Sequence, residues 1–300
     1  MLVTQDTIAL LLPEIYQVAI RQYAQRKDKK ALVFPIKNSK REYEEHVQMG
    51  AMLPAVKWDG SISFDTFKQG YTKKLTHVKY TRGIQIQHEW MLTEQYNVMN
   101  TLSASIADAI ADRERLEFSA FWDNSFTTTE DSGDGKALFA TNHPSKADAS
   151  LSVSNYGTTA LSYTELLTAR RIMKTTFKND RGTLIQIDPG LVIVPTNLEG
   201  TIAEIADSLD KPATGAGANW RGANFMQGIK YLVLDDLTDT TNWWYVDPEM
   251  MKRFLVWYYL LPAVFSSTDD FITMATMMAG AVMFSRGAFD FRFGYGEEVA

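Results

Sequence analysis

The sequence predicts an α+β fold in which an extended, charged hairpin and a long helix precede a layer of alternating strands and helices. Three observations lead to this prediction. Helical periodicity is missing from Phe34 to about Trp90, an amphipathic helix runs from about Thr93 to Asn124, and two later helices with N-cap signals alternate with short apolar strands. With 300 residues, of which 45% are hydrophobic, the chain can bury a sizeable core.

The composition excludes several classes of protein. The chain contains no Cys, which rules out disulfide scaffolds, zinc fingers, iron–sulfur clusters and thiol nucleophiles. The net charge of -6 argues against a generally basic nucleic-acid binder. Residues 1–100 nevertheless carry 14 basic and 10 acidic side chains, whereas residues 101–300 carry 16 and 26. The basic first third is suited to an anionic polymer or to the acidic body of a neighbouring copy.

Neither a membrane span nor a secretory signal is predicted. The longest apolar runs, residues 254–265 and 272–284, fall short of the roughly 18 to 20 residues that a spanning helix requires. The N-terminus lacks a basic start and a small-residue cleavage site, so we expect a protein that stays in a cytoplasm.

The first element is a helix over residues 5–24, where apolar side chains recur at helical spacing. It ends in a basic run from Arg21 to Lys30, and basic residues at the C-terminus of a helix suit its dipole. Contact of this run with nucleic acid is the alternative interpretation.

The second element, residues 34–90, reads as a long two-armed hairpin. It is rich in charge and contains short alternating pieces such as Ile62 with Phe64 and Ile84 with Ile86. A segment of this length with few apolar clusters cannot easily form its own core. We therefore expect it to lie on another surface, most naturally that of a neighbouring subunit.

The long helix, residues 93–124, has its apolar residues spaced by threes, fours and one seven, and would measure roughly 48 Å. A Ser-, Thr- and Gly-rich loop over residues 125–160 follows. Two helices with capping boxes come next, the first opened by Ser162 with Glu165 and the second by Thr196 with Glu199. The strands expected around and after them are Leu184–Ile187, Leu191–Val194, Tyr231–Leu234 and Trp243–Val246, with a flexible loop at Lys211–Gly228.

The C-terminal fifty residues are predicted to be β-rich. The two apolar runs named above are interpreted as buried strands or core helices. Four aromatic residues at every second position indicate one face of a further strand: Phe289, Phe291, Phe293 and Tyr295.

Each catalytic motif fails at an identifiable residue. His88-Glu89 begins a zinc-protease pattern, but Leu92 stands where the second histidine is required. The four widely spaced histidines predict no metal site, and no nucleophile elbow or phosphate loop is present. We interpret the acidic stretch of Glu130, Asp131 and Asp134 as a solvated turn. The sequence thus predicts neither an enzyme nor a cofactor.

One segment resembles a known family. The string from Asp134 to Pro144, DGKALFATNHP, is similar to a segment of tailed-phage major capsid proteins, in particular the Mu-like major head subunit group. Further elements of that group match in order over residues 134–206: Leu161-Ser162-Tyr163, Ala169-Arg170, Asp180-Arg181-Gly182, Pro189–Pro195 and Leu198-Glu199. Elsewhere the resemblance rests on the order of the elements.

The resemblance implies the Hong Kong ninety-seven phage type of capsid fold, with an N-terminal arm, an extended hairpin loop, a long spine helix, and peripheral and axial domains. The divisions we expect are an arm over residues 1–33, the extended loop over 34–90, and the spine helix with the start of the peripheral domain over 91–133. The axial domain would take 134–250, and 251–300 would return to the peripheral domain.

The implied function is that of a major capsid protein that self-assembles from hexamers and pentamers into an icosahedral shell and packages double-stranded DNA. Scaffold, portal and decoration proteins are the other partners implied, with assembly in the host bacterial cytoplasm and a final location in the virion capsid. The residues expected at contacts between subunits are Arg41, Glu44, Glu45, Trp58, Phe64, Phe67, Lys73, Lys74, Trp220 and Arg221.

Two alternatives remain open from the sequence. An encapsulin-type nanocompartment shares the shell fold but carries protein cargo. An α/β enzyme without a recognisable motif belongs to a different class, because pockets can be built without sequence signatures.

Overall fold

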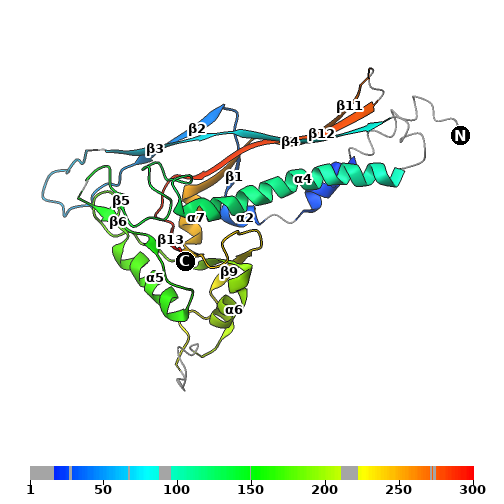
Figure 1. Ribbon diagram of the computed structural model, residues 1–300. Helices are drawn as coiled ribbons and strands as arrows, with labels where there is room; N and C mark the ends of the chain where they lie inside the picture. Colours follow the sequence, from blue (N-terminus) through cyan, green and yellow to red (C-terminus); the bar gives the residue numbers. More distant parts are fainter. Residues whose placement is uncertain are drawn as a thin grey trace.

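The computed structural model describes residues 17–26, 29–66, 68–87, 96–148, 150–210, 222–270, 272 and 275–300, with only the backbone of residues 96–100. Its longest layer is a four-stranded sheet in the order β1-β11-β12-β4. These strands are β1 (Ile36–Asn38), β11 (Leu255–Asp270), β12 (Ala275–Ala288) and β4 (Val78–Gln87). The spine helix α4 (Tyr96–Asp123) runs along one face of this sheet (Figure 1).

The packing of α4 confirms the helix that the sequence predicts over residues 93–124. Its 28 residues give a length of about 42 Å. The side chains that face the sheet and the rest of the core are buried, because their spacing places them on one side of the helix: Ile106, Ala107, Ile110, Phe118, Phe121 and Trp122.

The hairpin in the structure is shorter than the one predicted over residues 34–90. Its paired arms are β2 (Tyr43–Met49) and β3 (Gln69–Thr76), which form a separate two-stranded antiparallel sheet. Strand β4 instead pairs with β12 along ten residues, and β1 pairs with β11. The alternation at Ile84 and Ile86 therefore belongs to the main sheet, where Ile86 is buried in the core. The short helix α2 (Lys30–Val33) precedes β1.

A second layer is a five-stranded sheet in the order β7-β13-β10-β8-β9. Its strands are β7 (Tyr156–Gly157), β13 (Gly294–Glu297), β10 (Trp243–Val246), β8 (Leu191–Pro195) and β9 (Lys230–Leu234), and helices α5 (Tyr163–Thr176) and α6 (Glu199–Asp207) lie beside it (Figure 1). All four residues of β10 are buried, as expected of a strand covered on both faces. The remaining elements are η1 (Asn124–Phe126), β5 (His143–Pro144), β6 (Ser152–Val153), η2 (Thr196–Leu198) and α7 (Pro248–Phe254).

Of the two predicted capping boxes, only one forms. Ser162 Oγ accepts the Glu165 backbone N–H at 3.2 Å and caps α5. Thr196 instead begins the 3-10 turn η2, and its hydroxyl donates to Asp235 at 3.4 Å. The carboxylate of Asp235, the residue after β9, thus accepts the hydroxyl that would have capped α6. The strand predicted at Leu184–Ile187 is also wrong, because only a single bridge joins Leu184 to Lys178.

The C-terminal aromatic residues do not share one strand, as the alternation predicted. Strand β13 begins only at Gly294, so Phe291 and Phe293 lie in the turn before it. Both are buried in the main core all the same, while Phe289 packs beside β11 in a small separate cluster. Most of the predicted loop at Lys211–Gly228, residues 211–221, lies outside the described residues.

Glu297 at the end of β13 is a buried acid without a cationic partner among the described residues. Its Oε2 accepts the Thr159 backbone N–H at 2.7 Å, while Oε1 is buried without a hydrogen-bond partner in the described chain. Gly157 leaves room for this carboxylate, since a Cβ there would lie 2.2 Å from Oε2. Burial, with the charge of Glu165 adding to it, raises the pKa of Glu297 to about 7.

We expect Glu297 to make the folded chain less stable as pH rises from about 4.5 to 7. In that range the unfolded carboxyl is ionised while the folded one is still protonated, so the free energy of unfolding falls, by about 3 kcal/mol in total. Between pH 5 and pH 8 the free energy of unfolding, measured by chemical denaturation, should fall by about 3 kcal/mol less in Glu297→Gln than in the unmodified chain. Glu298→Gln, at the neighbouring position, is the control, and equal losses in Glu297→Gln and the unmodified chain would contradict the assignment.

Candidate assembly interface

The connection between β2 and β3, residues 50–66, carries a concentration of exposed apolar side chains. Phe64 is 90% exposed and Trp58 is 68% exposed. Four more large apolar residues of this hairpin tip are also exposed: Met52, Leu53, Val56 and Ile62. Single-chain soluble proteins rarely expose so large an apolar patch, and such patches mark sites of interaction.

The hairpin tip has local order of its own. Asp59 accepts the backbone N–H of Ser61 at 3.1 Å, and Gly60 between them has a φ of 105°, which favours glycine. Asp65 accepts the backbone N–H of Leu53 at 3.1 Å and so ties the two arms of the tip together. This hydrogen bond, with the charge of Arg181, lowers the pKa of Asp65.

The base of the tip rests on loops of the same chain. Arg181 places Nη2 3.2 Å from Asp65 Oδ1 and 2.7 Å from the Thr66 carbonyl. Around the start of β3, three side chains donate hydrogen bonds that join the hairpin to the segment 144–147. Lys68 donates to the Ala147 carbonyl at 3.0 Å, Lys146 to the Gly70 carbonyl at 2.9 Å and Tyr71 to the Pro144 carbonyl at 3.3 Å. The segment 131–147 therefore supports the hairpin from below.

The other end of the hairpin is anchored to the C-terminal strands. The His46 ring stacks on Phe289 at 3.8 Å between centroids, and its Nε2 lies 2.8 Å from the Tyr258 hydroxyl. Burial lowers the pKa of His46, which keeps the ring neutral. Leu75 is buried over Gly287, where a Cβ would lie only 2.5 Å from its side chain. The hairpin is thus a projecting arm with a fixed base and an exposed apolar end (Figure 1).

The structure divides the predicted contact residues into groups. Trp58 and Phe64 lie at the exposed tip, and Arg41 and Glu45 are exposed near the base, where Arg41 lies 3.9 Å from Glu44. Three of the charged residues have further partners in their own chain: Glu44 accepts the Ser39 hydroxyl at 2.7 Å, Lys74 lies 3.7 Å from the Tyr43 ring centroid, and Lys73 pairs with Asp131. Phe67, Trp220 and Arg221 lie outside the described residues.

The interpretation of residues 130–134 as a solvated turn is wrong. Glu130 and Asp131 pair with Arg286 and Lys73, and Asp134 is bonded to His143. Burial outweighs these charges at two of the sites, since it raises the pKa of Glu130 and lowers that of Lys73. These partners cannot be predicted from the sequence, because each lies in another element.

A second exposed apolar surface is the face of the four-stranded sheet that points away from α4. Gly280 of β12 faces the helix, since a Cβ there would lie 3.1 Å from Ile106. Because side chains alternate along a strand, the neighbouring positions of β12 point outward. The apolar strip of this outer sheet face consists of Met277, Ala279, Ala281 and Met283 of β12 with Val264 of β11, all exposed or half-buried. Exposed polar side chains of β4 lie beside the strip at the paired positions: Lys79, Thr81 and Gln85.

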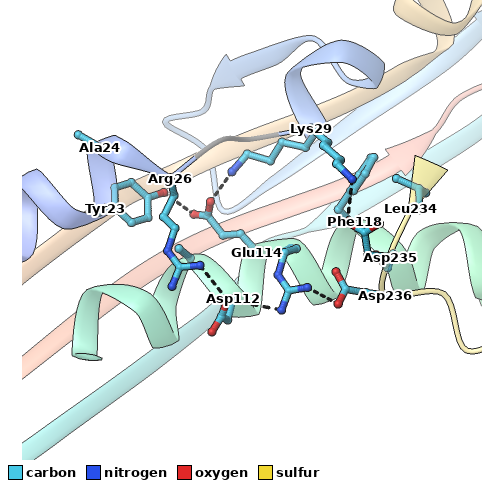
Figure 2. Close-up of a pocket in the computed structure, with 14 residues that line it drawn as sticks. Tyr23, Ala24, Arg26, Lys29, Asp112, Glu114, Phe118, Leu234, Asp235 and Asp236 are labelled. Carbon is cyan, nitrogen blue, oxygen red and sulfur yellow. Dashed lines mark hydrogen bonds and ion pairs between the residues drawn. The ribbon is translucent and has the colours of Figure 1, made fainter. Parts of the chain in front are cut away.

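A cavity of about 400 Å³ separates the N-terminal helix, residues 17–25, from α4 and the end of β9 (Figure 2). Its charges are paired across these elements: Arg26 lies 2.8 Å from Asp108, Lys29 lies 2.8 Å from Asp235, and Arg115 pairs with Asp236. These pairs fasten the described part of the arm to the spine helix and the five-stranded sheet.

Within the described residues there is no group of three or more His, Asp or Glu side chains placed to hold a metal ion. The same residues contain no helix with the length and apolar character of a membrane span.

Comparison with known families identifies the chain. The family model described as phage capsid protein matches residues 70–295, which is most of the sequence. The chain belongs to this family of phage capsid proteins. The resemblance to phage capsid proteins drawn from residues 134–206 is thereby confirmed. A search of curated proteins by sequence gives no match.

Solved structures show the same fold at low sequence identity. The virus-like particle from Pyrococcus furiosus has a TM-score of 0.57 at 5% identity, covering 96% of this chain and 99% of that one. Microbacterium phage Oxtober96 has a TM-score of 0.56 at 8% identity, over 92% of both chains. The capsid of cyanophage P-SCSP1u has a TM-score of 0.53 at 13% identity, over 89% and 86%. The capsid protein therefore has the expected Hong Kong ninety-seven type of fold.

We expect Arg181→Ala to loosen the hairpin tip without unfolding the capsid protein. The substitution removes the ion pair with Asp65 and the hydrogen bond to Thr66, two contacts worth about 1 kcal/mol each. Limited proteolysis should cut within residues 50–66 several times faster. Arg171→Ala, an exposed change on α5, is the matched control, and equal cleavage rates in the two variants would contradict the role given to Arg181.

Proposed function

We propose that copies of this capsid protein assemble, as pentamers and hexamers, into a closed icosahedral shell around double-stranded DNA, with each hairpin tip lying on a neighbouring copy. The exposed apolar tip carries this proposal. Burying a side chain such as Trp58 or Phe64 stabilises a contact by about 1.5–3 kcal/mol, whereas an exposed ion pair adds about 0–1 kcal/mol. The stability of the shell then comes from many copies of one small apolar contact.

The outer sheet face is the surface that this tip would cover. It lies outside the cover of α4, and it carries an apolar strip in which the small side chains Ala279 and Ala281 lie between larger ones. A rigid arm that projects beyond its own subunit can reach such a strip only on another copy, which makes every copy both donor and acceptor.

The two sheets support a division into two domains. We assign the peripheral domain to the four-stranded sheet with α4, and the axial domain to the five-stranded sheet with α5 and α6. Exposed basic side chains of the N-terminal third, such as Arg21, are suited to packaged DNA. A scaffold, a portal, a decoration protein and assembly in the bacterial cytoplasm complete the proposal, and no catalytic residue is assigned.

Electron microscopy of the purified chain, with the mass distribution of the same sample, tests this function. Closed shells, tubes or rings of five and six copies are expected. A chain that stays at 33.9 kDa in all salt conditions, with and without a co-expressed scaffold, would overturn the proposal.

An encapsulin-type nanocompartment is the second candidate, and the likeness in fold to the virus-like particle from Pyrococcus furiosus favours it. The family match favours the phage shell. Particles purified from an infected host that contain double-stranded DNA would support the first candidate, and particles that contain a single protein cargo would support the second.

A further inference from the structure

The segment that supports the hairpin is closed by a buried pair of polar side chains. His143 Nδ1 lies 2.6 Å from Asp134 Oδ2, and the two side chains are only 0% and 2% exposed. These residues are the first and the penultimate of the string DGKALFATNHP, so the pair closes the loop between them. Gly133, one residue earlier, packs against the backbone of Thr72 in β3.

The second ring nitrogen of His143 also faces an oxygen. Nε2 lies 3.1 Å from Asn155 Oδ1. The orientation of that amide is fixed, because Oδ1 accepts the Ala140 backbone N–H at 2.9 Å while Nδ2 donates to the Leu138 carbonyl at 3.0 Å. A flipped amide would place its nitrogen against an N–H group and its oxygen against a carbonyl. Oδ1 of Asn155 is therefore an acceptor toward the ring.

Asp134 is an acceptor as well. Its Oδ1 accepts the Lys136 backbone N–H at 3.0 Å and the Ser132 hydroxyl at 3.3 Å, contacts that suit a carboxylate. Burial opposes ionisation, but the hydrogen bond and charge of His143, together with these donors, lower the pKa of Asp134. Both ring nitrogens thus face acceptors, whereas a neutral imidazole carries only one N–H.

We infer that His143 is held as a doubly protonated imidazolium, and that it acts as a positioning residue that fixes the segment 131–147 beneath the hairpin. The ring stacks on Phe291 at 3.8 Å and 8°, so a positive charge would lie over an aromatic face. Loss of one ring proton would leave a lone pair facing an oxygen inside the core.

The surrounding charges are compatible with a cation at this place. Arg292 lines the same small cavity as His143, and its positive charge is paired with two carboxylates, Asp180 and Asp290. The charged and titratable groups around the site, besides Asp134, are Tyr71 of β3, Lys178 and Asp180 after α5, and Asp290 and Arg292 before β13.

Nuclear magnetic resonance of the full-length chain with ¹⁵N-labelled histidine tests the protonation directly, in solution or on sedimented shells. At neutral pH His143, identified by its loss in His143→Gln, should give two protonated ring nitrogens. In Asp134→Asn the new amide can donate to the ring, so the same histidine should give one protonated and one bare nitrogen. A single protonated ring nitrogen in the unmodified chain would overturn the inference.

Hydrogen exchange of β3 tests the positioning role. Amides of residues 71–76 should exchange about tenfold faster in Asp134→Asn than in the unmodified chain. Asp239→Asn, the same change in an exposed turn, is the control. Equal exchange in both variants would overturn the positioning role. Any effect on shells rests on the proposed function. Both measurements can be made on the unassembled chain, so a result against this inference can be distinguished from a result against the proposed function.

Discussion

Trp58→Asp combined with Phe64→Asp should give a folded capsid protein that forms no shells. The two side chains are 68% and 90% exposed in the single chain, so their replacement should leave its melting temperature unchanged within a few degrees. At a contact they would each contribute about 1.5 kcal/mol or more, and losing both raises the concentration needed for assembly at least about a hundredfold. Sedimentation and electron microscopy over a concentration series measure this threshold.

Lys57→Asp is the matched control for this pair. It introduces an acid into the same tip but removes no large apolar side chain, so its assembly threshold should rise by less than about tenfold. If the double variant forms normal shells at the same concentrations as the unmodified chain, the hairpin tip is not the contact that holds the shell together.

Lys30→Met should cost about 3–5 kcal/mol of unfolding free energy, because it leaves the carboxylate of Glu114 buried without its cation. The two side chains are 6% and 4% exposed, and Lys30 also lies 5.2 Å from the ring of Trp257. Tyr23 donates its hydroxyl to the same carboxylate at 2.8 Å, so the N-terminal helix depends on this site too (Figure 2).

Urea unfolding measures this cost, and the Trp58→Asp, Phe64→Asp background keeps assembly from masking it. Lys30→Met with Glu114→Leu is the informative control, since removing both charges together should restore most of the lost stability. A loss below 1 kcal/mol in Lys30→Met alone would show that the pair is more hydrated than its burial indicates.

The elements predicted correctly from the sequence are those whose signals are local. The spine helix follows from the spacing of Leu102, Ile106 and Leu116, and the cap of α5 follows from Ser162 with Glu165, three residues away. The hairpin was predicted too long because the partner of β4 is β12, almost two hundred residues further along the chain. A pairing at that distance leaves no mark in the alternation of either strand.

For the candidate interface, too, the sequence predicts only the residues whose signal is local. Trp58 and Phe64 were predicted because large apolar residues in a charged, aperiodic segment are conspicuous, and the same signal could have found Met52, Val56 and Ile62. The ion pairs of Arg181, Lys73 and Asp134 are not predicted from the sequence, since the fold alone brings their partners to them. An acidic stretch that contains glycine is interpreted as a solvated turn when the cationic side chains that pair with it are distant in the sequence.

The place of β13 in the five-stranded sheet sets the order of events during synthesis. This strand lies between β7 and β10, yet it is translated about 140 residues after the former and 50 after the latter. The sheet cannot close until the ribosome has released residues 294–297, which makes its folding slow and late. A nascent chain therefore has no finished axial layer to offer to a growing lattice, and only copies translated through β13 can be recruited.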